Sequence, residues 1–402
     1  MDFTISDKMQ TVIEMMDEFV DKELIPLEAE FLSDSAEDFQ KKIEEKQEKV
    51  KQMELWAPSH PKELGGMGLD LTEYALVSEA LGRSPLGHYV FGCQAPDAGN
   101  VEILHEYGTE EQKQKYLKPL VEGRIRSCFA MTEVDQPGSN PILLDTTAEK
   151  KGDKYVINGR KWYTTAADGS DFTIVMAVTN PEASQYLQAS MIIVPTGTPG
   201  YSLVRNIPVM GHKGEGYFSH GEVLFQNCEV PQENLLGPEG HGFVLAQDRL
   251  GPGRIHHCMR WIGVCKRALD LMCDYARKRY INPPDKNLAS KQMVQQWIAE
   301  SSAEIQAARL MVLHAAWRME QEGNKAARKD VSQIKFMVAN AMQNVVDRAL
   351  QVHGGLGMTD DTVLAFFYRH ERAARIYDGA DEVHKISAAK QILKEYEGRK
   401  VK

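Results

Sequence analysis

The sequence predicts an α+β fold, with helical regions at both ends of the chain and a module of antiparallel strands between them. Residues 1–125 and 238–402 contain long helix-favouring stretches. Residues 126–237 instead contain short runs of β-branched and aromatic residues separated by Gly, Asn, Asp and Pro, which is typical of antiparallel strands. A chain of 402 residues has room for two or three structural units, so we expect three domains with these bounds.

The N-terminal domain is expected to consist of helices. Residues 37–56 form a charged, helix-favouring stretch that predicts a solvated outer helix, and residues 61–84 pass from a glycine-rich turn into another helix. Asp70 or Thr72 would cap that helix. The first helix shows its apolar face at intervals of three and four, in Met9, Val12, Ile13, Met16 and Phe19.

The C-terminal domain is predicted to be a four-helix bundle. Residues 242–280 favour one long helix, in which Pro252 and Gly253 predict a kink or break. Two further helical patterns follow, and a final helix begins after Tyr377. The stripe Cys258, Cys265 and Cys273 lies on one face of the long helix, which favours core packing.

Composition excludes several classes of protein. There are 47 basic and 57 acidic residues, so the net charge is −10, which argues against nucleic acid as the main partner. The sequence has no run of about 18 apolar residues, no secretory or transit signal at its start and no S-K-L at its end. Six cysteines without C-x-x-C spacing indicate reduced thiols. We therefore expect a cytoplasmic protein that is not bound to a membrane.

Familiar catalytic and nucleotide-binding motifs are missing. His256 and His257 are adjacent and cannot share one helix face, so no metal site is expected. The sequence also lacks the G-x-S-x-G elbow of hydrolases, the P-loop and the G-x-G-x-x-G fingerprint. A nucleotide cofactor would have to bind in another way.

Five segments together resemble one family. They are FAMTEVDQPGSNP (129–141), NGRKWYTTAADGSDFTIVMA (158–177), LGPGRIHHCMRWIGVCKRALD (250–270), QVHGGLG (351–357) and RIYDGADEVHKISAAKQIL (375–393). In this order and spacing they resemble the acyl-CoA dehydrogenase family over essentially the whole chain. RLGPGRIHHCMR and the Y-D-G-x-D-E-V-H ending are most similar to the branch of acyl-CoA dehydrogenase family members ten and eleven, without their extra N-terminal domains.

The resemblance implies FAD-dependent oxidation of an acyl-CoA thioester to the trans-2-enoyl-CoA. A base removes the α-proton while the β-hydrogen leaves as hydride to flavin N5, and the protein supplies orientation and the base. It also implies an electron-transfer flavoprotein as electron acceptor, a role in fatty acid metabolism, and a homo-oligomer, either a dimer or a homotetramer.

The resemblance also assigns cofactor contacts in the central domain. Phe129, Met131 and Thr132 would contact the flavin ring, and Gly138 and Ser139 would lie near the pyrophosphate and the thioester arm. The strand residues that would cover the other side of the flavin are Tyr163, Thr164 and Thr165.

Further cofactor contacts are expected in the C-terminal domain. Gln351, Gly354 and Gly355 match a loop that reaches the FAD of a neighbouring subunit, although a helix C-cap would use glycines in the same way. Arg279 matches an arginine that pairs with the phosphate region, with simple solvation as the alternative. The expected contacts after the base are Ala380 and Glu382.

Asp378 is the expected base. The family usually has Tyr-Glu-Gly where this chain has Tyr377-Asp378-Gly379, so the carboxylate is one methylene shorter. An Asp before Gly is otherwise most often a turn residue. The carboxylates that could replace Asp378 as base are Glu371, Asp381 and Glu382.

The sequence departs from the family in three other places. The flavin loop VDQPGSNP is one residue longer than the commonest form, and Ala380 replaces a threonine that usually contacts the flavin. RYINPPDKN, at 279–287, replaces the usual arginine-to-phenylalanine segment and puts the adenine pocket in doubt.

The acyl pocket also looks unusual, because the segment around Arg254 is polar and basic where simple fatty-acyl enzymes have small or apolar residues. One hypothesis is an acyl group with a hydroxyl, phosphate or other polar substituent, with Arg254, Ser139 and Gly379 as substrate contacts. The alternative is that these side chains face FAD, the CoA phosphates or a subunit interface. The polar residues concerned are Arg254, His256, His257 and Arg260.

Two other functions remain open at this level. Nitroalkane oxidases and acyl-CoA oxidases share the architecture, and the former also use an aspartate base. A flavin-bearing nucleic-acid-binding relative is the second, although the acidic net charge disfavours it.

Overall fold

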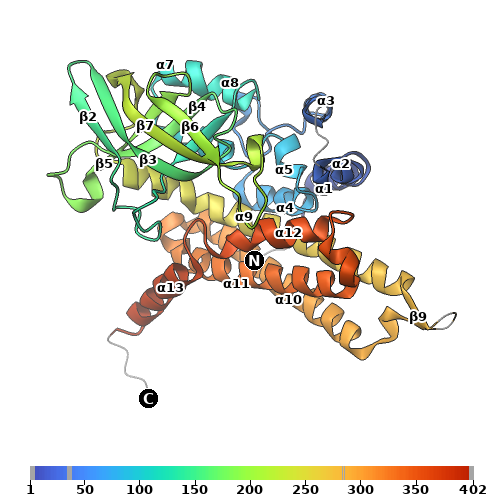
Figure 1. Cartoon of the computed structure of the whole chain (residues 1–402). Coiled ribbons are helices and arrows are strands. Elements are labelled where there is room, and N and C mark those ends of the chain that lie inside the picture. The colour runs from blue at the N-terminus through green and yellow to red at the C-terminus, as the bar shows by residue number, and fades with distance from the viewer. Residues whose placement is uncertain (1–4, 34–38, 283, 285, 398–402) are drawn as a thin grey trace. The chain divides into compact units, whose positions relative to one another are not determined.

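The computed structural model describes residues 5–33, 39–282, 284 and 286–397 (Figure 1). The chain forms two compact units. The helical unit comprises Met1–Ser59, Leu69–Phe91 and Gly251–Lys402, and the sheet unit comprises His60–Gly68 and Gly92–Leu250. Helical ends and a central sheet confirm the predicted α+β fold class. The terminal residues on which the targeting predictions partly depend, 1–4 and 398–402, lie outside the described residues.

The sheet unit is built on one eight-stranded sheet, drawn in green to yellow in Figure 1. The strand order is β6-β7-β3-β2-β4-β5-β8, and β1 pairs with β4 in parallel. The sheet is therefore antiparallel in most pairs but mixed around β4, which the prediction of a purely antiparallel module missed. The strands are β1 (Ser127–Ala130), β2 (Thr147–Lys151), β3 (Lys154–Thr165), β4 (Phe172–Val178), β5 (Ala189–Pro195), β6 (Tyr201–Asn206), β7 (His220–Pro231) and β8 (Leu235–Leu236).

Both faces of the central strands are buried. Along β4, Phe172 and Ile174 join a core cluster that includes residues of the unit's short helices, while Val175 joins the cluster on the other face. Since successive side chains of a strand point to opposite faces, two buried faces explain why this run is apolar at every position but Thr173. The helices of this unit are α6 (Asp97–Tyr107), α7 (Glu110–Gln112) and α8 (Lys118–Val121), with a π-helical turn at Lys113–Leu117.

The helical unit contains the long helices coloured orange and red in Figure 1. α10 and α11 are joined at Gly323, whose φ of +82° suits glycine, and α13 packs against α11. The helices are α1 (Asp7–Phe19), α2 (Glu28–Leu32), α3 (Phe39–Gln52), α4 (Leu71–Leu81), α5 (Gly87–Val90), α9 (Gly242–Lys278), α10 (Gln292–Glu322), α11 (Asn324–His353), α12 (Val363–Glu371) and α13 (Asp381–Glu395). A small hairpin of β9 (Tyr280–Asn282) and β10 (Lys286–Asn287) follows α9.

Helix α4 fixes the position of α9 within this unit. Asp70 caps α4 by accepting a 2.7 Å hydrogen bond from the Glu73 amide, which confirms one of the two predicted caps. A Cβ at Gly82 would lie 2.3 Å from the Arg260 carbonyl, and one at Gly263 would lie 2.3 Å from the Glu79 carbonyl. The two backbones therefore meet where only glycine fits, one turn from the functional residues of α9.

Helix α9 is one continuous helix. Pro252 lies inside it, so the predicted break does not occur, and the division between the two units falls at Leu250–Gly251. All six cysteines are free; Cys258 and Cys265 are fully buried as predicted, and Cys273 is half-buried. Among the described residues, none of the helices combines the length and apolar character needed to cross a membrane.

Candidate active site

The candidate base lies on a strained turn of the helical unit. Asp378 follows the 3-10 helix Arg372–Arg375 and precedes α13, with φ at +53°, and Gly379 follows with φ at +99°. A non-glycine residue at positive φ persists where its surroundings hold it there, and such residues cluster at functional sites. The Asp378 side chain is 21% exposed, so its carboxylate is accessible without being fully solvated.

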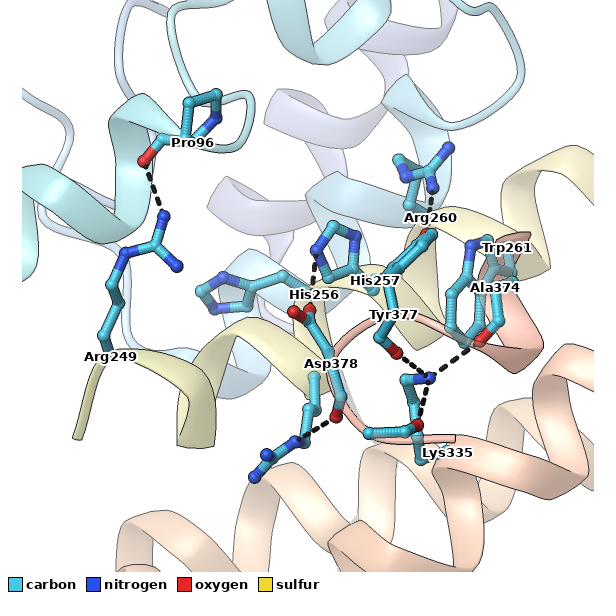
Figure 2. Close-up of polar contacts among 12 residues, drawn as sticks. Pro96, Arg249, His256, His257, Arg260, Trp261, Lys335, Ala374, Tyr377 and Asp378 are labelled. Carbon is cyan, nitrogen blue, oxygen red and sulfur yellow. Dashed lines mark hydrogen bonds and ion pairs between the residues drawn. The ribbon is translucent and has the colours of Figure 1, made fainter. Parts of the chain in front are cut away.

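A buried lysine holds the backbone of this turn. Lys335 on α11 is fully buried, and its Nζ donates to the carbonyls of Ala374 and Tyr377 at 2.7 Å each and to that of Gly379 at 3.3 Å (Figure 2). Three oxygen acceptors match the three donors of an ammonium group. Burial lowers the pKa of Lys335, and the charge of Asp378 opposes that shift.

The carbonyl of Asp378 itself has two partners. Arg254 Nε on α9 donates to it at 3.0 Å, and His384 Nε2 on α13 lies 3.0 Å away as a second donor. Together with Lys335, these contacts tie the turn to α9, α11 and α13. The backbone conformation of the base is therefore determined by three helices of one unit.

The Asp378 carboxylate points to His257 on α9, with 3.3 Å between Oδ2 and Nε2 (Figure 2). Burial raises the pKa of Asp378, but the hydrogen bond and charge of His257 and the charges of Lys335 and Arg254 outweigh it. Together they hold the pKa well below the usual range of an aspartate. The carboxylate is therefore ionised at neutral pH, as a proton acceptor must be.

An ion pair anchors the aromatic residues beside the base. Arg260 on α9 and Glu371 on α12 form a two-pronged contact, and Trp261 Nε1 donates to Glu371 Oε2 at 3.0 Å. Arg260 Nη2 also donates to the Tyr377 hydroxyl at 3.1 Å. Burial raises the pKa of Glu371, but Arg260 outweighs it and keeps the carboxylate ionised.

These contacts distinguish Asp378 from the other carboxylates considered as base. Glu371 is engaged by Arg260, and Asp381 accepts from Arg375 Nε and Asn340 Nδ2 at 2.9 Å each. Glu382 is exposed in the first turn of α13, and Ala380 is the N-cap residue of that helix. Asp378 thus combines an accessible carboxylate with a single side-chain contact.

The four polar residues in this part of α9 face two different neighbours. Arg254, His257 and Arg260 face the turn and its anchors, as described above. His256 instead packs its ring edge-to-face on Tyr74 of α4, with 4.3 Å between ring centres. The Nε of Arg254 is used on the Asp378 carbonyl, and no described residue accepts from its two terminal nitrogens.

The sheet unit contains the residues expected to contact a flavin. Phe129 lies on β1 under the guanidinium of Arg249, 4.3 Å from the ring centre. Met131 and Thr132 follow β1, and their carbonyls accept from Lys161 Nζ at 2.9 Å and from the Trp162 amide at 3.0 Å. The segment after β1 is therefore fixed to β3.

Strand β3 leaves polar atoms without partners. Within the described part of the chain, the buried Trp162 Nε1 and Thr164 Oγ1 have no hydrogen-bond partner. Tyr163, between them, has φ at +48° and a side chain exposed over 47% of its surface. Thr165 Oγ1 lies 3.0 Å from His220 Nδ1. Unmatched buried polar atoms cost free energy unless a ligand completes them, so this surface suits a ligand with hydrogen-bonding groups.

Two more predicted contacts lie in the loop after β1. Gly138 and Ser139 are exposed, and Gly138 lines a hollow of about 10 Å³ with Met131 and Thr132. That volume holds about one water molecule. The loop thus brings Gly138 close to the Met131–Thr132 segment, while Ser139 remains at the surface.

The remaining predicted cofactor contacts lie at the far end of α11 and after α9. Gln351 lines a cavity of about 270 Å³ with Trp297 of α10 and Arg348 of α11. Gly354 and Gly355 follow at the exposed C-terminus of α11. Arg279 is exposed at the end of α9, before the β9–β10 hairpin; of the segment predicted to alter the adenine pocket, Pro283 and Asp285 lie outside the described residues.

Comparisons with known proteins match this geometry. Models of the acyl-CoA dehydrogenase N-terminal, middle and C-terminal domains match residues 6–124, 128–228 and 240–393. The probable acyl-CoA dehydrogenase FadE2 of Mycobacterium tuberculosis is 47% identical over 354 residues, covering 87% of this chain and 85% of FadE2. The chain belongs to the acyl-CoA dehydrogenase family.

Other members of the family show how far the similarity extends. Acyl-CoA dehydrogenase family member 11 of Gallus gallus is 41% identical, covering 97% of this chain; the chain spans about half the length of that relative, 51%. The solved structure of a putative acyl-CoA dehydrogenase from Mycobacterium abscessus superposes with a TM-score of 0.93 at 38% identity, covering 98% and 100% of the chains. The FAD complex of PigA superposes with a TM-score of 0.82 at 26% identity, covering 98% and 99%.

Family membership makes the chain an oxidoreductase and confirms the resemblance seen in the sequence. Sequence reasoning did not single out Lys335, and it named Arg260 and Glu371 without foreseeing that they pair beside the candidate base. A signal was present, since Lys335 interrupts the apolar run Ile334–Met337 on α11. A lysine within a core face is rarely buried without a partner.

Proposed function

We propose that this acyl-CoA dehydrogenase family member removes one hydrogen each from Cα and Cβ of an acyl-CoA thioester, with Asp378 as the base. The α-proton moves to a carboxylate oxygen of Asp378, and the product is the trans-2-enoyl-CoA. The observation that carries the proposal is the carboxylate of Asp378, ionised, accessible and held on a turn that three helices determine.

FAD is the cofactor, and it accepts the β-hydrogen as hydride when bound. The residues of the sheet unit fit this group, because Trp162 Nε1 and Thr164 Oγ1 are buried donors without partners among the described residues. Thr132, Tyr163 and Thr165 complete the surface that would hold the flavin. By the family resemblance, Gln351 and Gly354 would contact the cofactor of a neighbouring subunit, and the 270 Å³ cavity beside Gln351 supports that role.

We also propose that the acyl group carries a hydroxyl or other polar substituent. Among Arg254, His256, His257 and Arg260, Arg254 has terminal nitrogens with no acceptor among the described residues. Burial lowers the pKa of Arg254, so the surroundings disfavour its charge and favour a ligand that accepts hydrogen bonds. An unsubstituted acyl chain would leave these donors unmatched.

The remaining expectations are part of the proposal. They comprise the three domains at 1–125, 126–237 and 238–402, a homo-oligomer, an electron-transfer flavoprotein as acceptor and a cytoplasmic location. A dimer or tetramer fits the apolar side chains exposed on α13, including Ile386 and Leu393, which are 56% and 68% exposed in the single chain.

The test is anaerobic bleaching of flavin absorbance by a panel of CoA thioesters with short, long, branched, 4-hydroxy and 4-phospho acyl chains. Bleaching by any class supports dehydrogenation, and preference for a substituted chain supports the role of Arg254. Equal turnover of an unsubstituted chain of the same length would contradict the substituent. Peroxide release in air would instead identify an oxidase, and a protein that takes up no FAD would overturn the proposal.

A further inference from the structure

The histidine beside the base has a defined place in the helical unit. His257 stacks on Trp261 at an interplanar angle of 20° and meets Tyr377 edge-to-face, with ring centres 6.1 and 5.3 Å away. Both neighbours are anchored by the Arg260–Glu371 pair. The imidazole is therefore held between two aromatic rings, with Nε2 directed to Asp378 Oδ2.

This arrangement leaves the two oxygens of Asp378 in different surroundings. Oδ2 accepts from His257 Nε2 at 3.3 Å, whereas Oδ1 has no side-chain partner among the described residues. A neutral imidazole with its proton on Nε2 supplies a hydrogen bond without a charge, while an imidazolium adds a full positive charge beside the carboxylate. The second state makes the carboxylate a weaker base.

We propose that His257 is a positioning residue of the reaction, and that its protonation switches the basicity of Asp378. The neutral imidazole fixes the carboxylate so that Oδ1 takes the α-proton, and the imidazolium form is the inactive state. The proposal rests on the proposed function. In the proton transfer itself the Cα–H bond breaks and an O–H bond forms on Oδ1, with no proton moving to or from His257.

Several charged and titratable groups surround His257 in the helical unit. Burial lowers the pKa of His88 well below its usual value and that of His384 to about 4. Asp378 and Glu371 have lowered pKa values and stay ionised. The titratable and charged side chains that face this region include His88 of α5, Arg254, His256 and Arg260 of α9, Lys335 of α11, His370 and Glu371 of α12, Tyr377 and Asp378 of the turn, and His384 of α13.

The test is the pH profile of flavin reduction by whichever thioester bleaches the wild-type protein. Because an imidazolium beside Asp378 makes its carboxylate a weaker base, the wild-type rate should fall toward acid pH and give the profile an acidic limb. His257→Gln keeps an N–H at the Nε2 position without the ability to charge. It should reduce flavin within about fivefold of wild type at pH 8 and lose the acidic limb of the profile. His257→Leu removes the hydrogen bond and should be about 10–10² slower at pH 8, the scale of a misplaced reacting group.

His314→Gln is the matched control, since His314 also lies beside an aspartate, 3.8 Å from Asp330, but on α10 and half-exposed. It should keep both the rate and the acidic limb. An acidic limb that survives in His257→Gln, or a His257→Leu protein as fast as wild type at pH 8, would overturn the proposal. If no thioester bleaches wild type, the proposed function fails first, so the two failures are distinguishable.

Discussion

The turn around Asp378 and the segment Trp162–Thr164 of β3 differ in how their polar groups are paired. In the helical unit, three carbonyls share Lys335 and the Asp378 carbonyl has two donors. In the sheet unit, Trp162 Nε1 and Thr164 Oγ1 are buried without a partner among the described residues. A catalytic base has to be oriented before its substrate binds. On a surface that binds a cofactor, by contrast, hydrogen-bond donors stay unpaired until the cofactor accepts from them. Mutations should therefore destabilise the empty protein in the first region and the cofactor complex in the second.

The largest effect is expected at the Arg260–Glu371 pair. Arg260→Met leaves Glu371, whose side chain is 3% exposed, as an unpaired buried charge, which typically costs about 3–5 kcal/mol. Urea unfolding of the protein without added thioester measures this loss. Lys154→Met, which breaks a solvent-exposed pair with Glu229, is the control and should leave the midpoint nearly unchanged. Equal midpoints for the two variants would contradict the anchoring role.

The next largest effect concerns catalysis alone. Asp378→Asn should keep bound FAD and its yellow colour while flavin reduction slows by at least ~10², the usual scale for losing a general base. Stopped-flow absorbance under anaerobic conditions measures the rate. Asp274→Asn, an exposed carboxylate on α9, is the control and should reduce flavin as wild type does. Retained activity in Asp378→Asn would move the base to another carboxylate.

Acid should weaken the helical unit before its carboxylates protonate. Burial lowers the pKa of His384 to about 4, whereas an unfolded histidine titrates near 6.5. Between these values the unfolded chain binds more protons, so the free energy of unfolding falls as the pH drops from 6.5 to 4. The pKa of Glu371 is also lowered, through its pairing with Arg260, so its contribution to stability is lost in turn as the pH falls below the usual range of a glutamate. His384→Gln should make the stability profile flatter between pH 4 and 6.5, and an unchanged slope would contradict this assignment.

The smallest effect on the empty protein is expected in the sheet unit. Thr164→Val removes a buried hydroxyl that has no partner among the described residues, so the thermal midpoint of the FAD-free protein should change little. FAD should then stabilise the variant less than wild type, because the gain from a ligand follows its affinity. Melting curves at several FAD concentrations compare the two proteins. If FAD raised the thermal midpoint of Thr164→Val as much as that of wild type, Thr164 would not contact the cofactor.

The sequence predicted the fold class because its helix-favouring stretches and its β-branched runs occupy separate parts of the chain. The short β-branched and aromatic runs of 126–237 and the cap at Asp70 are local signals, and both are confirmed. The mixed pairing of β1 with β4 is not local, since it joins strands more than 40 residues apart. Helix α9 continues through Pro252, and helix propensity alone could not predict this because it takes no account of packing.

The candidate site was predictable only in part for the same reason. Asp378 was identified through the Tyr-Asp-Gly motif. Its positive φ and its contact with His257 depend on how α9 and α11 pack around the turn, which the motif does not encode. His257 was identified only as one of several polar residues. The sequence shows that two adjacent histidines lie on different faces of a helix, but the packing of His256 on Tyr74 was needed to show which of them faces the turn. The cofactor residues on β3 came from the family resemblance, and their assignment stays a prediction.

The burial of the thiols has a practical consequence for studying assembly. Of the six cysteines, all of which are described, five are buried. Cys273 is half-exposed and lies near the C-terminal end of α9. Burial raises the pKa of the thiols of Cys258, Cys265 and Cys273, but only Cys273 is half-exposed, so a maleimide dye should attach chiefly there. Donor- and acceptor-labelled pools could then be mixed, and energy transfer between them would report subunit exchange from a single known position.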